Sequence, residues 1–370
     1  MDLSLSPDQE LIKNTAREFV SQEFSKETIL ELDLTESGFN KDLWDSVCEI
    51  GWLGILVPEK YGGSENSLTD AAVLYEELGR GPVPGPFFSS GILSVNILLQ
   101  TANEKQKAEI LPKIASGEYI VTPAITEPSY GWDKKYINLS IENNSLTGTK
   151  LFVQDGLSAT HILCAVRSEK NKDSISIVFI DANSEGISRK QLEGFLSASS
   201  EISFKSVKIT DDMILGDINT DQWDNLYSSI LNSLPILCSY QVGGSQAVFD
   251  LSVEYSRTRK QFGQSIGRFQ RVQDHIIEIV NHLDAARWTT YEALWKLESN
   301  MDSNTSIHLA SAVSSEAYLK ACDGGHTVHA GIGSLREYGL TLHTQMSRTL
   351  YHFLGDPKFH KRKIAKSLNF

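Results

Sequence analysis

The feature that most constrains the fold is a double change in hydrophobic periodicity along the 370 residues. Before about Glu118, apolar residues recur at helical spacing, as they do over Leu11–Phe19. Short alternating runs replace them up to about Asp221, and helical spacing then returns. This order predicts an α+β multidomain protein. Its expected parts are an N-terminal helical domain over 1–117, a middle antiparallel β domain over 118–220 and a C-terminal helical bundle over 221–370.

Helix-start signals support the first part. At the first of them, Ser6 can cap the helix and Gln9 can reach back to the cap. The signals occur at Ser6–Gln9, Ser67–Asp70 and Asn103–Gln106. The second helix is expected to end near Gly79–Pro82, and Pro112 is expected to constrain the end of the third.

The middle part carries strand and turn signals. Ile202–Ile209 alternates apolar and polar residues with one slip in register. Turns are expected at Asn143–Asn144 and Asp155–Gly156. Further strands are expected at Ile137–Ile141, Leu151–Val153, His161–Val166 and Ile175–Ile180.

The last part predicts long helices, because apolar and small residues step by three or four over Ile236–Tyr255, Val272–Leu283 and Ile307–Gly324. Small residues at the packing positions favour a tight bundle.

Composition excludes some classes of protein. A net charge of −13 argues against a nucleic-acid binder, and no apolar run approaches the roughly 20 residues of a membrane helix. The first residues lack a secretory signal. His326 and His329 have no third ligand pattern, so no metal is expected. Four scattered cysteines without a CxxC pair favour a reducing cytoplasm: Cys48, Cys164, Cys238 and Cys322.

Candidate ligand chemistry begins at Arg257–Gly263, with Gln270 following. Arginine supplies a planar cationic fork, phenylalanine a stacking face and glycine a close backbone approach, which together suit a phosphate-bearing aromatic ligand. The plainer alternative is a solvated helix end, where the helix dipole already favours cations.

This segment resembles the Arg-x-x-Phe-Gly…Gln signature of the acyl-CoA dehydrogenases. In that family the segment reaches the pyrophosphate and adenine end of a neighbouring subunit's FAD. The resemblance assigns that role to Arg259, Phe262 and Gln270.

Further segments resemble the same family and follow one another in the order in which the family carries them. Ala124–Asp133 is similar to the Thr-Glu-Pro-x-x-Gly-x-Asp loop, which gives Ile125 and Thr126 contact with the flavin ring. Gly148–Gly156 is similar to the strand that packs an aromatic beside the ring, which implies roles for Phe152 and Gln154, although Phe152 read alone would be a core residue.

The fourth segment, His329–Gly333, resembles a glycine-rich turn that also reaches a neighbour's FAD. The resemblance implies a role for Gly331, although Thr327 and Ala330 depart from the family pattern. The family further implies a middle β-barrel, a C-terminal four-helix bundle, a tetramer, an acyl-CoA substrate, FAD and an electron-transfer flavoprotein as acceptor.

The family's catalytic carboxylate is missing. The reaction needs a base that removes the α-proton of the thioester while the flavin accepts the β-hydrogen as hydride. Gly355 and Ser233 occupy the two positions where family members carry that Glu, and Asp356 is a neighbouring substitute. Further departures from the family pattern fall in the half of the site that this chain would build for its own flavin: Trp132, Gln154, Pro357 and Phe359.

Three functions stay open at this stage. The leading one is an FAD-dependent subunit of a heteromeric α2β2 enzyme, because Gly355–Pro357 with His360 resembles such bacterial subunits. In that case a paralogous partner supplies the Glu. The second is a self-sufficient homotetramer that uses Asp356 as base, and the third is a non-catalytic acyl-CoA-binding or scaffold subunit.

Overall fold

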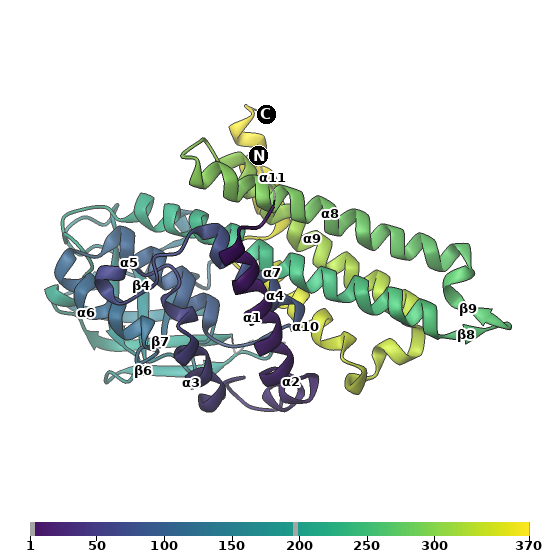
Figure 1. Cartoon of the computed structure of the whole chain (residues 1–370). Helices are drawn as coiled ribbons and strands as arrows, with labels where there is room; N and C mark the ends of the chain where they lie inside the picture. The colour runs from purple at the N-terminus through teal and green to yellow at the C-terminus, as the bar shows by residue number, and fades with distance from the viewer. Residues whose placement is uncertain (1–3, 195–198, 370) are drawn as a thin grey trace. The chain divides into compact units, whose positions relative to one another are not determined.

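The computed structural model describes residues 4–194 and 199–369 (Figure 1). By its internal contacts the chain divides into two compact units. The bundle unit comprises the residues up to Asp33, Ser67–Val83 and the chain from Leu234 onward; the sheet unit comprises Leu34–Asn66 and Pro84–Ser233. The boundaries 1–117, 118–220 and 221–370 therefore stay a prediction, while the order of helices, sheets and helices is confirmed.

The bundle unit is helical. Its elements are α1 (Pro7–Glu23), α2 (Lys26–Leu32), α4 (Leu68–Arg80), the larger part of α7 (Trp223–Thr258), the β8–β9 hairpin (Lys260–Gln261 and Gln264–Ser265), α8 (Gln270–Glu298), α9 (Asn304–His329), α10 (Leu340–Tyr351) and α11 (Pro357–Ser367). The helices α8 and α9 pack along one another as an extended hairpin (Figure 1).

Small residues let these helices approach closely, as their spacing predicts. A Cβ on Gly79 of α4 would lie 1.9 Å from the Tyr240 carbonyl oxygen of α7. A Cβ on Gly243 would lie 1.8 Å from the Glu76 carbonyl oxygen. Backbone therefore meets backbone where α4 crosses α7, and only glycine fits at either position.

The sheet unit holds strands β1 to β7 and the remaining α-helices. They are α3 (Lys41–Ile50), α5 (Val95–Thr101), α6 (Glu104–Ala115), β1 (Val121–Ala124), β2 (Ile141–Glu142), β3 (Ser145–Val153), β4 (His161–Arg167), β5 (Ile175–Asp181), β6 (Ile187–Gln191) and β7 (Ser200–Lys208). A π-helix, η3, spans Ser89–Ser94, and short 3₁₀ helices of this unit lie at Trp52–Gly54, Glu59–Tyr61, Lys134–Tyr136 and Asp211–Met213. The bundle unit has further 3₁₀ helices at Ile266–Arg268, Ala330–Ser334 and Arg336–Tyr338.

The strands form two sheets in the orders β1-β4-β5 and β2-β3-β7-β6. Every strand pair is antiparallel except β1 with β4, and the chain between those two forms β2 and β3 instead of a crossover helix. A bridge between Ser140 and Arg167 joins the sheets. Buried residues of both sheets share one core, among them Leu146, Ile162 and Phe204. The predicted β domain is thus confirmed, with its strands in two joined sheets.

Local signals account for most element ends. The three predicted helix starts are confirmed, each with a reciprocal capping box, at Ser6, Ser67 and Asn103. The slip in Ile202–Ile209 is a bulge opposite β3, where Ser206 takes a positive φ of 53°.

One expectation needs correction. A strand over Ile137–Ile141 is wrong for its first three residues, because the Glu127 carboxylate accepts the backbone N–H groups of Asn138 and Leu139. Those groups are therefore not used in a strand ladder. Pro112 lies in the last turn of α6, which ends at Ala115.

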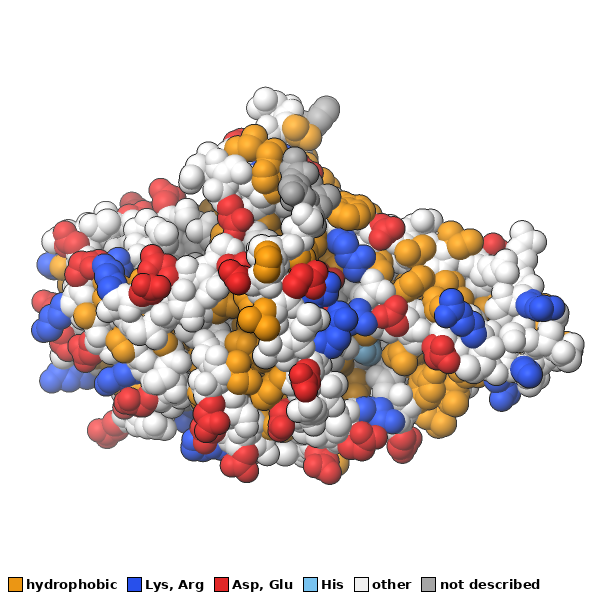
Figure 2. Space-filling model, viewed as in Figure 1, with side chains coloured by type: hydrophobic (Ala, Val, Ile, Leu, Met, Phe, Trp, Pro, Cys, Tyr) orange, Lys and Arg blue, Asp and Glu red, His pale blue; other side chains and the backbone are white. Residues whose placement is uncertain are grey.

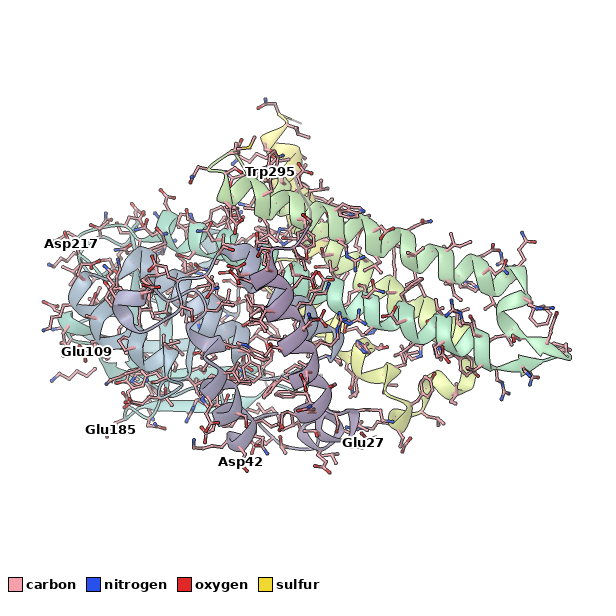
Figure 3. All side chains as sticks on the ribbon, in the orientation of Figure 1. Glu27, Asp42, Glu109, Glu185, Asp217 and Trp295 are labelled. Carbon is pink, nitrogen blue, oxygen red and sulfur yellow. The ribbon has the colours of Figure 1, made fainter. Side chains whose placement is uncertain are left out.

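The surface agrees with the acidic composition. Acidic side chains such as Glu109, Glu185 and Asp217 are exposed and project outward (Figure 3). No helix in the described ranges is long and apolar enough to span a bilayer. All four cysteines are free thiols, and three of them are buried.

Candidate cofactor and base sites

A β-bulge presents Phe152 on the surface of the sheet unit. Lys150 pairs with Ile202 and Val153 with Ser200, so between those pairs β3 has one residue more than β7. Phe152 falls inside the bulge with a positive φ of 55°, and 49% of its surface is exposed. Bulges re-aim side chains and concentrate next to functional sites. The bulge therefore makes Phe152 available to a ligand, where uninterrupted alternation would have buried it.

The loop after β1 runs beside this bulge. The Leu151 N–H donates to the Thr126 carbonyl oxygen at 2.9 Å. Thr126 is half-buried, and its hydroxyl has no hydrogen-bond partner in the described part of the chain. The structure thus brings Ile125, Thr126 and Phe152 together, as the sequence predicts, and leaves a hydroxyl and an aromatic face unused.

Gln154 is engaged differently. Its side-chain amide nitrogen donates to Ser199 Oγ at 2.9 Å, and its backbone carbonyl oxygen accepts from Thr122 Oγ1 at 2.6 Å. The side chain is therefore held by β7's end in this structure. Next to it, the buried Asp155 carboxyl accepts a 2.5 Å hydrogen bond from Ser89 of η3. Burial, partly offset by that hydrogen bond, raises the pKa of Asp155 to about 6.

Two more aromatic rings extend the surface at Phe152. The Tyr130 ring meets Phe152 edge-on at 5.7 Å and Trp132 edge-on at 5.0 Å between centroids. Tyr130 also has a positive φ of 46°. Trp132, which replaces a small family residue, therefore packs through Tyr130 onto the aromatic that the family sets beside the flavin ring.

The other predicted cofactor residues gather at one end of the bundle unit. Phe262 lies at the tip of the β8–β9 hairpin with 92% of its surface exposed, and it touches Phe269 edge-on at 6.0 Å. Arg259 and Gln270 flank the hairpin and are exposed. No ion pair holds Arg259 within the described ranges.

Gly331 lies at the same end. The helix α9 that precedes it is linked to α7 by His329, whose ring stacks on Tyr255 with centroids 4.6 Å apart. A Cβ on Gly331 would meet nothing within 4 Å. An exposed arginine, an exposed phenylalanine and open backbone fit a phosphate-bearing aromatic ligand that comes from outside the chain.

The two histidines here serve structural contacts. His326 Nε2 pairs with Thr344 Oγ1 at 2.7 Å, and His329 Nδ1 donates to the Gly325 carbonyl oxygen at 2.7 Å. Across residues 4–194 and 199–369, no group of three or more His, Cys, Asp or Glu side chains is arranged to hold a metal.

The loop Phe353–Pro357, called the base loop here, has no room for a side chain at Gly355. Gly355 has a φ of 125°, which is strained for any other residue. A Cβ there would lie 2.7 Å from His360 Nε2 and 2.7 Å from Phe359 Cδ1. The space that a family Glu would need is therefore filled by the first turns of α11.

A buried histidine pair supports that arrangement. His308 Nδ1 and His360 Nδ1 are 2.9 Å apart, so one ring donates and the other accepts. Burial lowers the pKa of His308 to about 4 and that of His360 to about 3, so both rings are neutral at neutral pH. His360 also hydrogen-bonds the Gly355 backbone. The contact to His308 could not be inferred from the spacing of residues in the sequence.

Asp356 has a structural task. Its Oδ1 accepts from the Phe359 N–H at 2.6 Å, which caps the N-terminus of α11. The carboxylate is turned toward its own helix.

Ser233, at the second family position, is fully buried. Its hydroxyl donates to the Ser229 carbonyl oxygen at 2.8 Å and accepts from Asn96 Nδ2 at 2.9 Å. Ser229 in turn donates to the Asn96 carbonyl oxygen at 3.0 Å. Neutral hydrogen-bond partners thus satisfy this position completely.

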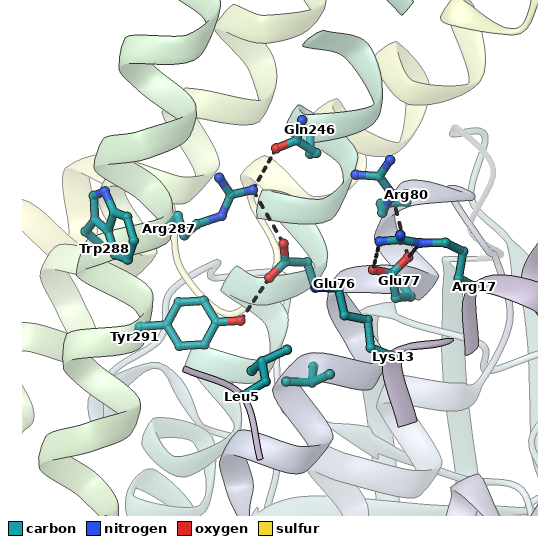
Figure 4. A pocket seen from close by; sticks show the side chains of 11 residues that line it. Leu5, Lys13, Arg17, Glu76, Glu77, Arg80, Gln246, Arg287, Trp288 and Tyr291 are labelled. Carbon is teal, nitrogen blue, oxygen red and sulfur yellow. Dashed lines mark hydrogen bonds and ion pairs between the residues drawn. The ribbon is translucent and has the colours of Figure 1, made fainter. Parts of the chain in front are cut away.

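A separate cleft of about 390 Å³ lies in the bundle unit between α1, α4 and α8 (Figure 4). Figure 2 shows cationic side chains beside hydrophobic ones on this face. The cleft contains none of the predicted site residues. Both of its carboxylates are paired with arginines of the lining, Glu77 with Arg17 at 2.7 Å and Glu76 with Arg287 at 3.5 Å. We therefore interpret it as an ion-pair network that joins the three helices.

Comparison with known proteins gives the family. Residues 6–118 match the acyl-CoA dehydrogenase N-terminal domain, and residues 227–369 match the acyl-CoA dehydrogenase C-terminal domain. The fold and these matches define an oxidoreductase class, the FAD-dependent enzymes that act on the CH–CH bond of acyl-CoA thioesters. The chain belongs to the acyl-CoA dehydrogenase family.

Relatives cover the whole chain at modest identity. The probable acyl-CoA dehydrogenase YngJ of Bacillus subtilis is 25% identical, with 100% of both chains covered. The caffeyl-CoA reductase–Etf complex subunit CarC of Acetobacterium woodii is 26% identical over 90% of each chain. The ChsE4–ChsE5 complex from Mycobacterium tuberculosis has the same fold, with a TM-score of 0.90, 20% identity and coverage of 100% of this chain and 99% of that one.

Proposed function

We propose that this chain is an FAD-binding subunit that dehydrogenates an acyl-CoA thioester between its α and β carbons, together with a paralogous partner that supplies the catalytic Glu. The proposal rests on the state of the two positions where the family places its base. At Gly355 a side chain of any kind collides with His360 and Phe359, and at Ser233 the chain has built a neutral hydrogen-bonded cluster. Gly355, the first position where the family places its base, therefore has no space for a side chain. At Ser233, the second position, neutral hydrogen bonds already satisfy the polar groups.

The chain's own residues suit the other half of the chemistry. FAD, when bound, supplies the acceptor for the hydride that leaves the β carbon. The hydroxyl of Thr126 and the bulged Phe152 would orient its ring, while Arg259 and Phe262 would contact the phosphate and adenine end of a neighbour's FAD. The α-proton would pass to a carboxylate of the partner, whose pKa burial would raise into a useful range.

Support for the partners comes from relatives. The ChsE4–ChsE5 structure is described as a complex of two chains, which favours a heteromeric assembly here, and the tetramer is the family's form. CarC is named as a subunit of a complex with an Etf, which favours an electron-transfer flavoprotein as acceptor. Four unpaired cysteines favour a cytoplasmic location.

Co-expression with a paralogous family member, followed by subunit and flavin counting, tests the proposal. We expect a stable complex of both chains that carries flavin and oxidises acyl-CoA. A homotetramer of this chain with full flavin and turnover would favour the self-sufficient enzyme. A complex without flavin would favour the scaffold.

A further inference from the structure

A buried lysine lies directly behind the bulge that presents Phe152. Lys150 has no exposed surface, although lysine is among the residues least often buried. It precedes the bulge and sits on the same strand as the core residue Leu146, at a position where alternation would place an apolar side chain. A buried ammonium group must find charged and polar partners, or it costs several kcal/mol.

Lys150 and Leu151 together contact three consecutive residues of the loop after β1. Lys150 Nζ donates to the Glu127 carboxylate at 2.8 Å and to the Ile125 carbonyl oxygen at 3.1 Å. The next residue of the strand, Leu151, donates its N–H to the Thr126 carbonyl oxygen at 2.9 Å. Each residue of 125–127 thus forms a hydrogen bond or ion pair with Lys150 or Leu151. Thr126 is therefore fixed by its own hydrogen bond and by those of both its neighbours.

Glu127 extends the same network. Its carboxylate also accepts the N–H groups of Asn138, at 2.9 Å, and Leu139, at 3.0 Å. Only 6% of its surface is exposed. The ion pair is therefore satisfied on both sides, which makes its geometry specific: a lateral shift of the loop would break several hydrogen bonds at once.

We infer that Lys150 and Glu127 are positioning residues for the flavin-contacting surface, and we call this pair the Lys150 clamp. It fixes the Thr126 hydroxyl against the bulged Phe152, so that a planar ring meets both in one geometry. This inference rests on the proposed FAD site. Neither residue touches the ring in this account, because both are buried beneath the loop.

The test is the double variant Lys150→Met/Glu127→Gln, studied in the assembly that the parent forms. It removes both charges together, so no buried charge is left unpaired, and the glutamine oxygen still accepts one of the two backbone N–H groups. The matched control is Lys41→Met/Asp45→Gln, which removes an exposed ion pair from α3. FAD affinity, the visible flavin spectrum and far-ultraviolet circular dichroism are measured for each protein.

We expect the clamp variant to keep its circular dichroism spectrum, to bind FAD at least tenfold more weakly and to lose the protein-induced shift of the flavin band. The control pair should match the parent in all three. A clamp variant with the parent's FAD affinity and flavin spectrum would overturn the inference. A variant that no longer folds would also overturn it, because the pair would then hold the sheet and not the loop. Failure of the proposed function would appear in the parent itself, as an assembly without flavin.

Discussion

Thr126 and Gly355 differ in what the surrounding chain leaves open. In the sheet unit, hydrogen bonds hold the chain at Thr126 and at both its neighbours, while the Thr126 hydroxyl has no partner among the described residues. At Gly355, the bundle unit turns the backbone to a φ of 125° and fills the side-chain space with His360 and Phe359. The first arrangement preserves a surface for a ligand, whereas the second removes one. Under the proposed function, a subunit of this kind keeps the cofactor side of the reaction and takes the base from a partner.

The largest expected effect of a substitution in this chain is at the base loop. Gly355→Glu should lower the free energy of unfolding by about 3 kcal/mol or more, because positive φ strain and overpacking against His360 each cost about 1–3 kcal/mol. Denaturant melts would measure the loss, with the open Gly331→Glu as the control for stability. A Gly355→Glu chain as stable as the parent that also gains turnover would break the comparison.

A similar effect should appear as a pH dependence at the end of β3. The pKa of Asp155 is raised to about 6, so its contribution to stability is full below the unfolded value near 4 and is lost as the pH rises through 6. At about 1.4 kcal/mol for each pKa unit, the loss is about 3 kcal/mol.

Asp155→Asn should therefore flatten stability between about pH 4 and pH 7 and stabilise the protein at pH 8. Chemical denaturation across that range would show it, and the exposed Asp173→Asn would serve as control. An Asn variant with the parent's pH slope would remove Asp155 from the account.

A smaller effect is expected on FAD retention at the end of the bundle. Arg259→Ala should weaken FAD binding by about 1.5–3 kcal/mol through loss of a charge-assisted phosphate contact. Stability should hardly change, since Arg259 is exposed and forms no ion pair in the described ranges. Fluorescence titration with FAD would measure the loss, with Arg362→Ala of α11 as control. Equal affinity of variant and parent would refute the cross-subunit role.

The smallest effect is expected at Asp356. Asp356→Ala should cost about 1 kcal/mol of stability, because the N-cap of α11 is lost, whereas Asp356→Asn should keep the cap and cost little. Thermal melts would separate the two. Neither substitution should reduce the turnover of the complete assembly. Loss of turnover in the Asn variant would identify Asp356 as the base.

The sequence predicted those parts whose signals are local. Capping pairs such as Ser6–Gln9 and the slip in Ile202–Ile209 are written within a few residues, and the structure has both. The parallel pairing of β1 with β4 and the division of the N-terminal helices between two units depend on distant contacts, so spacing could not give them.

The site divides in the same way. Motifs located Thr126 and Phe152, but the bulge that exposes Phe152 depends on the register of β3 against β7. The clamp has one local sign in the sequence: a lysine at an interior position of an alternating strand requires a buried anion. His360 occupies the side-chain space at Gly355, and His308, 52 residues away in the sequence, contacts His360. Neither contact could be inferred from the spacing of residues in the sequence.

The most direct test of the central claim is anaerobic reduction of bound flavin by acyl-CoA. The chain alone, reconstituted with FAD, is mixed with acyl-CoA thioesters of increasing acyl size, and the visible flavin band is followed. The same measurement is made with the paralogous partner, and with a partner whose Glu at the matching position is changed to Gln. We expect the band to stay oxidised in the chain alone, to bleach with the partner, and to bleach at least about 10²–10⁴-fold more slowly with the Gln partner. Rapid bleaching by the chain alone would contradict the account.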